Sequence, residues 1–177
     1  MLKVRGHDIK EPAIKDSFSR RALKMKNNII EILSVLGVEP HQVDIDLETI
    51  PIRNAPASVT WYFAGQKLYY SYTSLPRFID NLFVVETIIE LEVTRLVTKD
   101  ISEDEFCRSF SEDDDVEQQR IEARQLLGVD VNERDFEVIS KKYKELAKEH
   151  HPDMPNGNPE LFKKINLAHK LLKRELI

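Results

Sequence analysis

The stretch KKYKELAKEHHPDMPNGNPELFKKIN, from Lys141 to Asn166, holds the strongest structural signal of the chain. Two segments with helical apolar spacing flank a run of His, Pro, Asp, Asn and Gly, which is typical of a loop. Asn158, Pro159 and Glu160 supply an N-cap, a proline at the first helical position and a first-turn acid. The pattern therefore predicts two helices joined by a loop of about eight residues, which permits an antiparallel pair.

Each of these helices has one apolar stripe. We expect the first to run from an N-cap at Asn132 to about His150. A further helix is predicted upstream in VEQQRIEARQLLGV, with Ile121, Leu126 and Leu127 facing inward and Gly128 ending it. The stripe residues of the helix pair are Phe136, Ile139, Tyr143, Leu146 and Ala147, then Phe162, Ile165, Ala168 and Leu172.

The loop residues His150, His151 and Asp153 have three candidate uses. A metal site is disfavoured, because adjacent histidines at a helix end point about 100° apart and no further ligand lies nearby. Catalysis by His151 and Asp153 lacks a nucleophile and a Gly-rich phosphate loop. The third use is a rigid, exposed recognition tip in which Pro152 fixes the backbone and His151 makes no core contact. We expect no metal and no cofactor.

The first part of the chain predicts a mixed α and β unit. Residues 57–72 predict a β-hairpin, because β-branched and aromatic residues flank Ala64-Gly65-Gln66-Lys67. A weaker strand is predicted in QVDIDLETIPI, residues 42–52. The fold class expected for the whole chain is α+β, with a helix, a three-stranded antiparallel sheet and two helices before an all-helical part.

The helices of this first part follow from periodicity and capping. Residues 13–36 predict an amphipathic helix ended by Gly37. Residues 77–99 predict a mostly buried helix that packs on the face of the hairpin carrying Val59, Trp61 and Phe63. Ser102 and Glu105 form the sequence pattern of a capping box and predict a short helix.

Three acids on the helix at residues 77–99 raise the question of a carboxylate site. Glu86, Glu90 and Glu92 have no neighbouring His or Cys cluster in the sequence. We therefore interpret them as solvated positions at the edge of the buried stripe. The alternative, an N-terminal enzyme that uses Glu86 and Glu90, remains open.

Charge is uneven along the chain. Residues 1–116 hold 14 basic and 20 acidic side chains, whereas residues 117–177 hold 12 and 11. The change falls in SEDDDVEQQ, so we expect one domain at 1–116 and another at 117–177. The acidic first part argues against a nucleic-acid partner.

Composition also indicates the cellular compartment of the protein. One cysteine, Cys107, forms no internal disulfide and suits a reducing compartment. The N-terminus has no apolar signal-peptide core, and charges interrupt the apolar stretch at 82–97. We expect a cytoplasmic protein with no membrane partner.

Three segments, RQLLGV (124–129), ISKKYKELAKEHHPD (139–153) and NPELFKKINLAHKLL (158–172), together resemble the J domain of DnaJ-type co-chaperones. The resemblance implies an antiparallel helix pair with the His-Pro-Asp loop at its end. It also implies docking on the ATPase domain of a DnaK-type heat-shock chaperone and stimulation of its ATP hydrolysis. A protein of this kind assists protein folding and is not itself an enzyme.

The resemblance assigns roles by position. Partner docking falls to His151, Pro152 and Asp153, with Lys141, Tyr143, Lys144 and Lys148 beside them. His150 and His169 take positions where aromatic residues pack. The implied core comprises Leu126, Leu127, Phe136, Ile139, Leu146, Ala147, Phe162, Ile165, Ala168 and Leu172.

Three positions depart from the family pattern. Arg124 stands where the family usually has an aromatic residue, and Ser140 and Glu145 replace basic residues of the docking helix. The dilution of positive charge motivates an alternative, a J-like interaction module without ATPase stimulation.

The N-terminal part has a resemblance of its own. VTWYFAGQKLYYSY and LPRFIDNLFVVETIIELEV are similar to the hairpin-plus-helix unit before the J domain of some small prokaryotic and viral J-domain proteins. This resemblance implies the arrangement of a hairpin followed by a helix, and it implies no activity. We expect the unit to select an unidentified client or a location.

Overall fold

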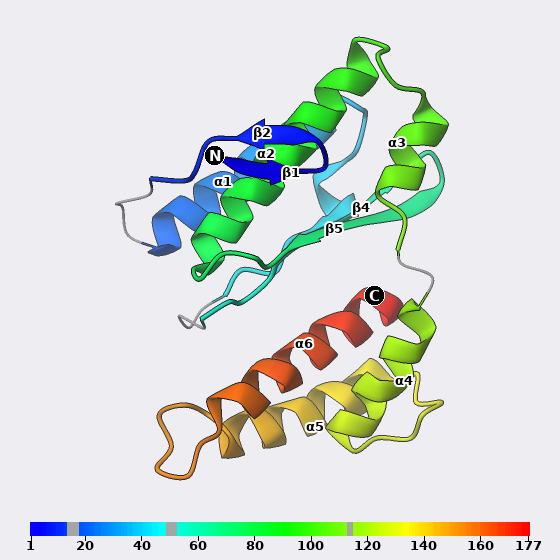
Figure 1. Cartoon of the computed structure of the whole chain (residues 1–177). Helices are drawn as coiled ribbons and strands as arrows, with labels where there is room; N and C mark the ends of the chain where they lie inside the picture. The colour runs from blue at the N-terminus through cyan, green and yellow to red at the C-terminus, as the bar shows by residue number, and fades with distance from the viewer. Residues whose placement is uncertain (14–17, 49–52, 113–114) are drawn as a thin grey trace. The chain divides into compact units, whose positions relative to one another are not determined.

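The computed structural model describes residues 1–13, 18–48, 53–112 and 115–177 and divides the chain into two compact units. Unit 1 is Met1–Glu112 and unit 2 is Asp113–Ile177, whereas the charge pattern places the domain boundary after residue 116. Unit 1 combines strands with helices and unit 2 is helical (Figure 1). The predicted α+β class is confirmed.

The sheet of unit 1 is antiparallel with the strand order β3-β4-β5. β4 (Ala57–Phe63) and β5 (Gln66–Tyr72) form the predicted hairpin, in which Trp61 lies opposite Leu68. Ala64 and Gly65 have φ of 50° and 73°. Positive φ at both central residues matches the twist of a two-residue hairpin turn. β3 is only Val43–Asp44, so the predicted third strand is much shorter than 42–52, of which residues 49–52 lie outside the described part.

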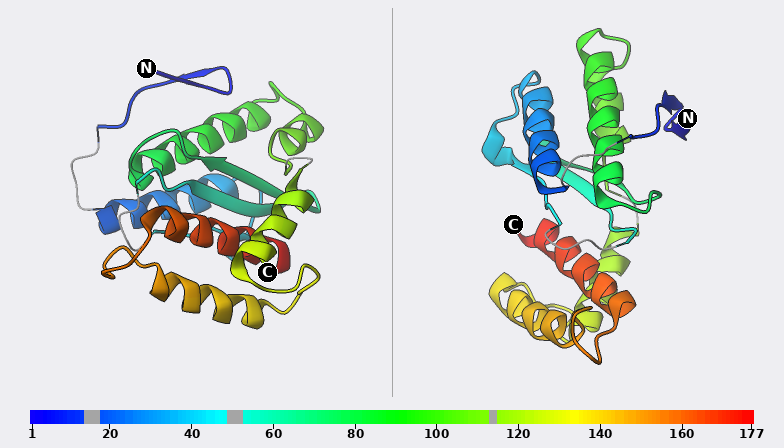
Figure 2. Two further views of the ribbon diagram at one scale, coloured as in Figure 1. Left: turned by 60° about the horizontal axis from the view of Figure 1, so that its bottom comes forward. Right: turned by 90° about the vertical axis from the view of Figure 1, so that its left-hand side faces the viewer.

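Three helices complete the predicted part of unit 1. α2 (Phe78–Val97) packs against β4 and β5, with α1 (Phe18–Ser34) beside it (Figure 2). The predicted first helix, 13–36, is longer than α1, and residues 14–17 of that range lie outside the described part. α3 (Glu103–Ser109) begins at the predicted N-cap Ser102, whose hydroxyl accepts from the Glu105 amide at 3.1 Å. A short 3-10 turn, Pro40–Gln42, precedes β3.

A second hairpin at the N-terminus was not predicted. β1 (Leu2–Val4) pairs antiparallel with β2 (His7–Ile9) through a turn at Arg5 and Gly6, which have φ of 50° and 80°. Val4 and Ile9 are buried in the core of unit 1, and β2 packs against α2. In the described part of the chain, no helix has the length and apolar character needed to span a bilayer.

Unit 2 is built from α4 (Val116–Leu127), α5 (Phe136–Glu149) and α6 (Pro159–Leu176). α5 and α6 run antiparallel, and α6 packs on both other helices (Figure 1). Asn158 is the N-cap of α6 and Gly128, with φ of 68°, ends α4, as predicted. The buried apolar core is formed by Ala123, Leu127, Ile139, Ile165, Ala168 and Leu172.

Two predictions about α4 and α5 are wrong. Ile121 and Leu126 were expected to face inward but are 38% and 37% exposed. The inward face is set by Ala123 and Leu127, which lie four residues apart on one side of the helix. α5 starts later than expected, because the Asp135 carboxylate accepts from the Glu137 amide at 2.8 Å and caps it in place of Asn132.

Candidate functional site

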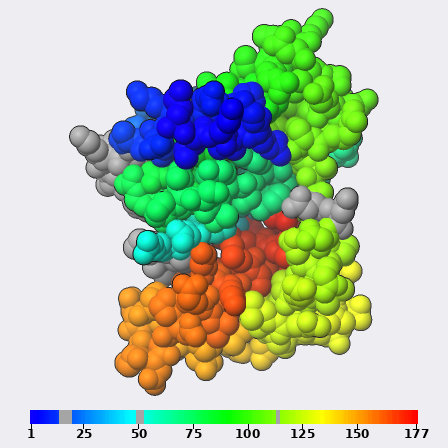
Figure 3. All heavy atoms as spheres, in the orientation of Figure 1, coloured from blue at the N-terminus to red at the C-terminus, as the bar shows by residue number. Residues whose placement is uncertain are grey.

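The loop between α5 and α6 is closed by its own backbone. The His150 amide donates to the Leu146 carbonyl at 2.9 Å, which ends α5. The Met154 amide then donates to the His151 carbonyl, and the Gly157 amide to the Met154 carbonyl, both at 2.9 Å. These two consecutive turns make the loop a compact projection at the end of the helix pair, orange in Figure 3.

Gly157 allows the loop to cross closely over its own start. A Cβ atom at this position would lie 1.9 Å from the carbonyl oxygen of His151, far inside van der Waals contact. The obstacle is backbone, which cannot swing away as a flexible side chain would. Glycine is therefore required here by the close approach of two chain segments.

His151 lies between the loop and α6. Its imidazole packs edge-on against the Phe162 ring, with centroids 5.2 Å apart, and its side chain is 28% exposed. Phe162 is buried, so the expectation that His151 makes no core contact is wrong. The Asp153 amide donates to Nδ1 of His151 at 3.2 Å, which orients the ring.

Asp153 and Pro152 form the exposed tip. The Asp153 side chain is 89% exposed, and its carboxylate lies 3.5 Å from Nδ1 of His151. Pro152 is exposed as well. The three residues thus present a half-buried imidazole, a rigid proline and a solvated carboxylate within one turn.

The lysines of α5 form a basic face. Lys141, Lys144 and Lys148 are exposed and recur at helical spacing, which places them on one side of the helix. Lys142 is paired with Glu145 at 3.2 Å. Glu145 therefore lowers the net positive charge of α5 through a contact within the same helix.

Tyr143 joins α5 to α6. Its ring stacks on His169 with centroids 4.0 Å apart, and its hydroxyl donates to Oδ1 of Asn166 at 2.7 Å. His169 also stacks on Phe136 and lies 3.3 Å from the Ser140 hydroxyl. His169 thus packs among aromatic rings, as expected, and Tyr143 is half-buried.

Arg124, which departs from the family pattern, has a buried guanidinium. Nε donates to the Glu133 carbonyl at 2.9 Å, and Nη2 donates to the Glu175 carboxylate at 2.7 Å. Arg134 also pairs with Glu175. A buried charge needs such partners, so α4 and the end of α6 are joined by ionic contacts.

The three acids of α2, predicted to be solvated, differ in their exposure. Glu92 is buried, accepts from Arg95 at 2.9 Å and lies 2.7 Å from Nε2 of His7, so the solvated interpretation is wrong for it. Burial raises the pKa of the Glu86 carboxyl, and the hydrogen bond from Asn28 acts against that rise. Glu90 is exposed. Sequence reasoning missed His7 because its hairpin was not predicted.

Among the residues that the structure describes, no group of three or more His, Cys, Asp or Glu side chains is arranged to hold a metal ion. His150 forms the C-cap of α5 and is half-buried.

Comparison with known proteins gives one match, which lies in unit 2. Residues 124–176 match the family model described as the DnaJ domain, and no family model matches the N-terminal part. No curated protein and no solved structure matches the chain. DnaJ domains generally bind DnaK-type heat-shock chaperones, and proteins that carry them are co-chaperones that stimulate the ATPase of the partner.

Proposed function

We propose that this protein is a co-chaperone that docks on the ATPase domain of a DnaK-type heat-shock chaperone and stimulates its ATP hydrolysis. The observation that carries the proposal is the DnaJ-domain match over residues 124–176, which includes His151, Pro152 and Asp153 on a compact exposed loop. In this role the protein assists the folding of client proteins.

Asp153 is the main docking group. Its solvated carboxylate is free to form a bidentate, charge-assisted pair with an arginine of the chaperone, one of the stronger polar contacts in proteins. The loop turns and Gly157 hold the carboxylate in place before contact, so little conformational entropy is lost on binding.

His151 and Pro152 give the docking surface its shape. The edge contact of His151 with Phe162 fixes the imidazole on α6, while the exposed part of the ring remains available to the partner. A small contact patch concentrates its binding energy in a few groups, so we expect these residues to dominate docking.

The basic face of α5 steers the encounter. Lys141, Lys144 and Lys148 attract an acidic surface of the chaperone and raise the association rate, with Tyr143 beside them as a contact residue. We propose that unit 1 selects the client or the location. We place the activity in the cytoplasm, which suits a chain with a single cysteine.

A second candidate function is an interaction module that binds the chaperone without stimulating hydrolysis. Two observations favour it: Ser140 faces His169 instead of adding a positive charge, and Glu145 pairs with Lys142. Both reduce the positive charge that α5 presents to a partner.

The two candidates differ in single-turnover ATP hydrolysis by a DnaK-type chaperone mixed with the full-length protein. We expect wild type and the control Glu137→Gln, which removes one acid at the opposite end of α5, to accelerate hydrolysis equally. The Asp153→Asn protein should stimulate hydrolysis at least about tenfold less than wild type, which is the effect expected when a residue that dominates a binding contact is changed. Binding of the protein to the chaperone is measured separately. If the protein binds but does not accelerate ATP hydrolysis, the interaction module is favoured. If it does not bind the chaperone at all, both functions are contradicted.

A further inference from the structure

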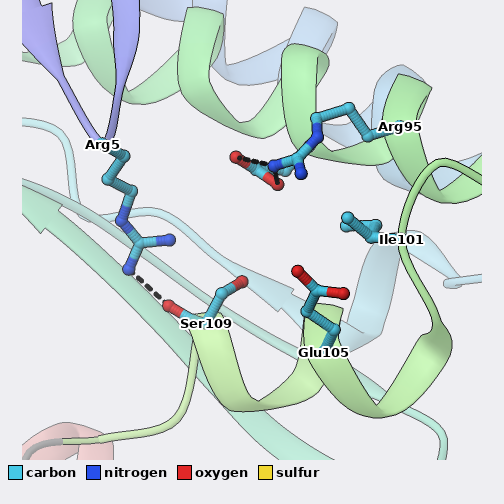
Figure 4. Close-up of a pocket in the computed structure, with 6 residues that line it drawn as sticks. Arg5, Arg95, Ile101, Glu105 and Ser109 are labelled. Carbon is cyan, nitrogen blue, oxygen red and sulfur yellow. Dashed lines mark hydrogen bonds and ion pairs between the residues drawn. The ribbon is translucent and has the colours of Figure 1, made fainter.

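Unit 1 contains a cavity of about 270 Å³ that the proposed function does not use (Figure 4). Its walls come from the turn of the N-terminal hairpin, from α2, from the segment before α3 and from α3 itself. The lining residues are Arg5, Glu92, Arg95, Ile101, Glu105 and Ser109. Ligand pockets for drug-sized molecules start near 300 Å³, so this cavity suits a smaller molecule.

Arg5 gives the cavity a fixed positive end. Its guanidinium lies over the rings of Tyr70 and Phe110, at 4.6 and 4.7 Å from their centroids, and donates to the Ser109 carbonyl. These contacts fix the plane of the group, and the hydrogen bond to Ser109 uses one of its five N–H donors. Figure 4 shows the guanidinium turned toward the cavity, where further donors are available to a ligand.

Glu92 and Arg95 form a wall with little net charge. The Glu92 carboxylate accepts from Nη1 of Arg95 at 2.9 and 3.1 Å and also contacts His7. Each charge is therefore offset by a neighbour inside the protein.

Glu105 supplies the negative end. Figure 4 shows its carboxylate directed into the cavity from α3. The side chain is exposed, and its carboxylate forms no ion pair with any residue that the structure describes. Buried Ile101 adds an apolar surface between the charged walls.

We propose that this cavity binds a free α-amino acid with an apolar side chain. The α-carboxylate pairs with Arg5, the α-ammonium pairs with Glu105, and the side chain lies against Ile101. A simple anion would be repelled by Glu105, and a simple cation by Arg5. A zwitterion of amino-acid size satisfies both ends, and charge-assisted hydrogen bonds are the strong ones. This proposal does not rest on the co-chaperone function.

The test uses ¹⁵N-labelled full-length protein and L-leucine, followed by amide chemical shifts of Arg5, Glu105 and Ser109. We expect saturable shifts with a dissociation constant on the order of 1 mM, the range of a small ligand with few contacts. L-Leucinamide lacks the carboxylate and N-acetyl-L-leucine lacks the ammonium. Each should bind at least about tenfold more weakly, because each leaves one charged group of the cavity unpaired.

Glu105→Gln should abolish the shifts, whereas Glu103→Gln, a charge-matched change in the same helical turn, should retain them. Absence of saturable shifts with L-leucine would overturn the proposal, as would an analogue that binds as tightly as L-leucine or retained binding by Glu105→Gln. The analogue comparison is made on wild-type protein, so it decides the matter even if a variant fails to fold.

Discussion

Nη2 of Arg124 lies 2.7 Å from Oε2 of Glu175, and the two side chains are only 2% and 8% exposed. The pair joins α4 to the last turn of α6. A buried ion pair stabilises a fold little more than a well-packed apolar pair would. Removal of one partner, however, leaves a buried charge without compensation. Arg124, which stands where the family resembled usually has an aromatic residue, therefore depends on Glu175 for a charged partner in its buried site.

Glu175→Gln tests this dependence. We expect a loss of about 3–5 kcal/mol in the free energy of unfolding, because Arg124 then keeps its charge in a buried site. Urea unfolding of the full-length protein, followed by the helical signal, measures the loss. Glu122→Gln, an exposed acid on α4, is the control and should stay within about 0.5 kcal/mol of wild type. A loss below about 1 kcal/mol for Glu175→Gln would show that water or another acid compensates Arg124.

Gly157→Ala tests whether the loop is preformed. A Cβ at 1.9 Å from the His151 carbonyl forces the backbone to move. We expect large amide shifts from His151 to Gly157 and reduced ATPase stimulation, while the core signals of Ile139 and Ile165 stay in place. An alanine variant with an unchanged loop spectrum would mean that the two segments do not approach closely in solution.

Glu145→Arg tests the orientation of the basic face. The change adds positive charge and releases Lys142 from its pair, so association with a DnaK-type chaperone should become faster at low salt. The gain should fade as salt rises, because screening acts over about 8 Å at physiological ionic strength. Stopped-flow association rates at two salt concentrations measure it, and an unchanged low-salt rate would show that Glu145 does not face the partner.

Trp61→Ala tests the core of unit 1. The Trp61 ring is fully buried and meets the edge of Phe110, with centroids 5.0 Å apart. Truncation leaves a large cavity, and we expect a cost of about 3–5 kcal/mol in the unfolding of unit 1. Chemical denaturation followed by near-ultraviolet circular dichroism of the remaining aromatic residues measures this cost. Tyr62→Ala, on the exposed side of β4, is the control and should cost far less.

Unit 2 was predictable in outline because its signals are local. Apolar spacing, the N-cap at Asn158 and the glycine after α4 mark helices through interactions within a few residues. The inward face of α4 was not predictable in the same way. That face includes buried Arg124, whose guanidinium pairs with Glu175, 51 residues away in the sequence.

In unit 1 as well, local signals were predictable from the sequence and contacts between distant residues were not. The hairpin at 57–72 carries its own turn and alternation, so its bounds were predicted closely. The N-terminal hairpin has strands of three residues each, too short to display periodicity, although Arg5-Gly6 forms a two-residue turn between them. Without that hairpin, the contact of Glu92 with His7 could not be foreseen, because the two residues lie 85 positions apart in the sequence.

We propose that His151, Pro152 and Asp153 form a recognition surface and not merely a turn. Single-turnover ATP hydrolysis by a DnaK-type chaperone, with wild type or His151→Gln, tests it most directly. Glutamine keeps hydrogen-bonding capacity but loses the ring and its contact with Phe162, which costs about 0.5–1.5 kcal/mol of stability. The protein should stay folded and lose its stimulation. A folded His151→Gln protein that stimulates hydrolysis as strongly as wild type would contradict the account.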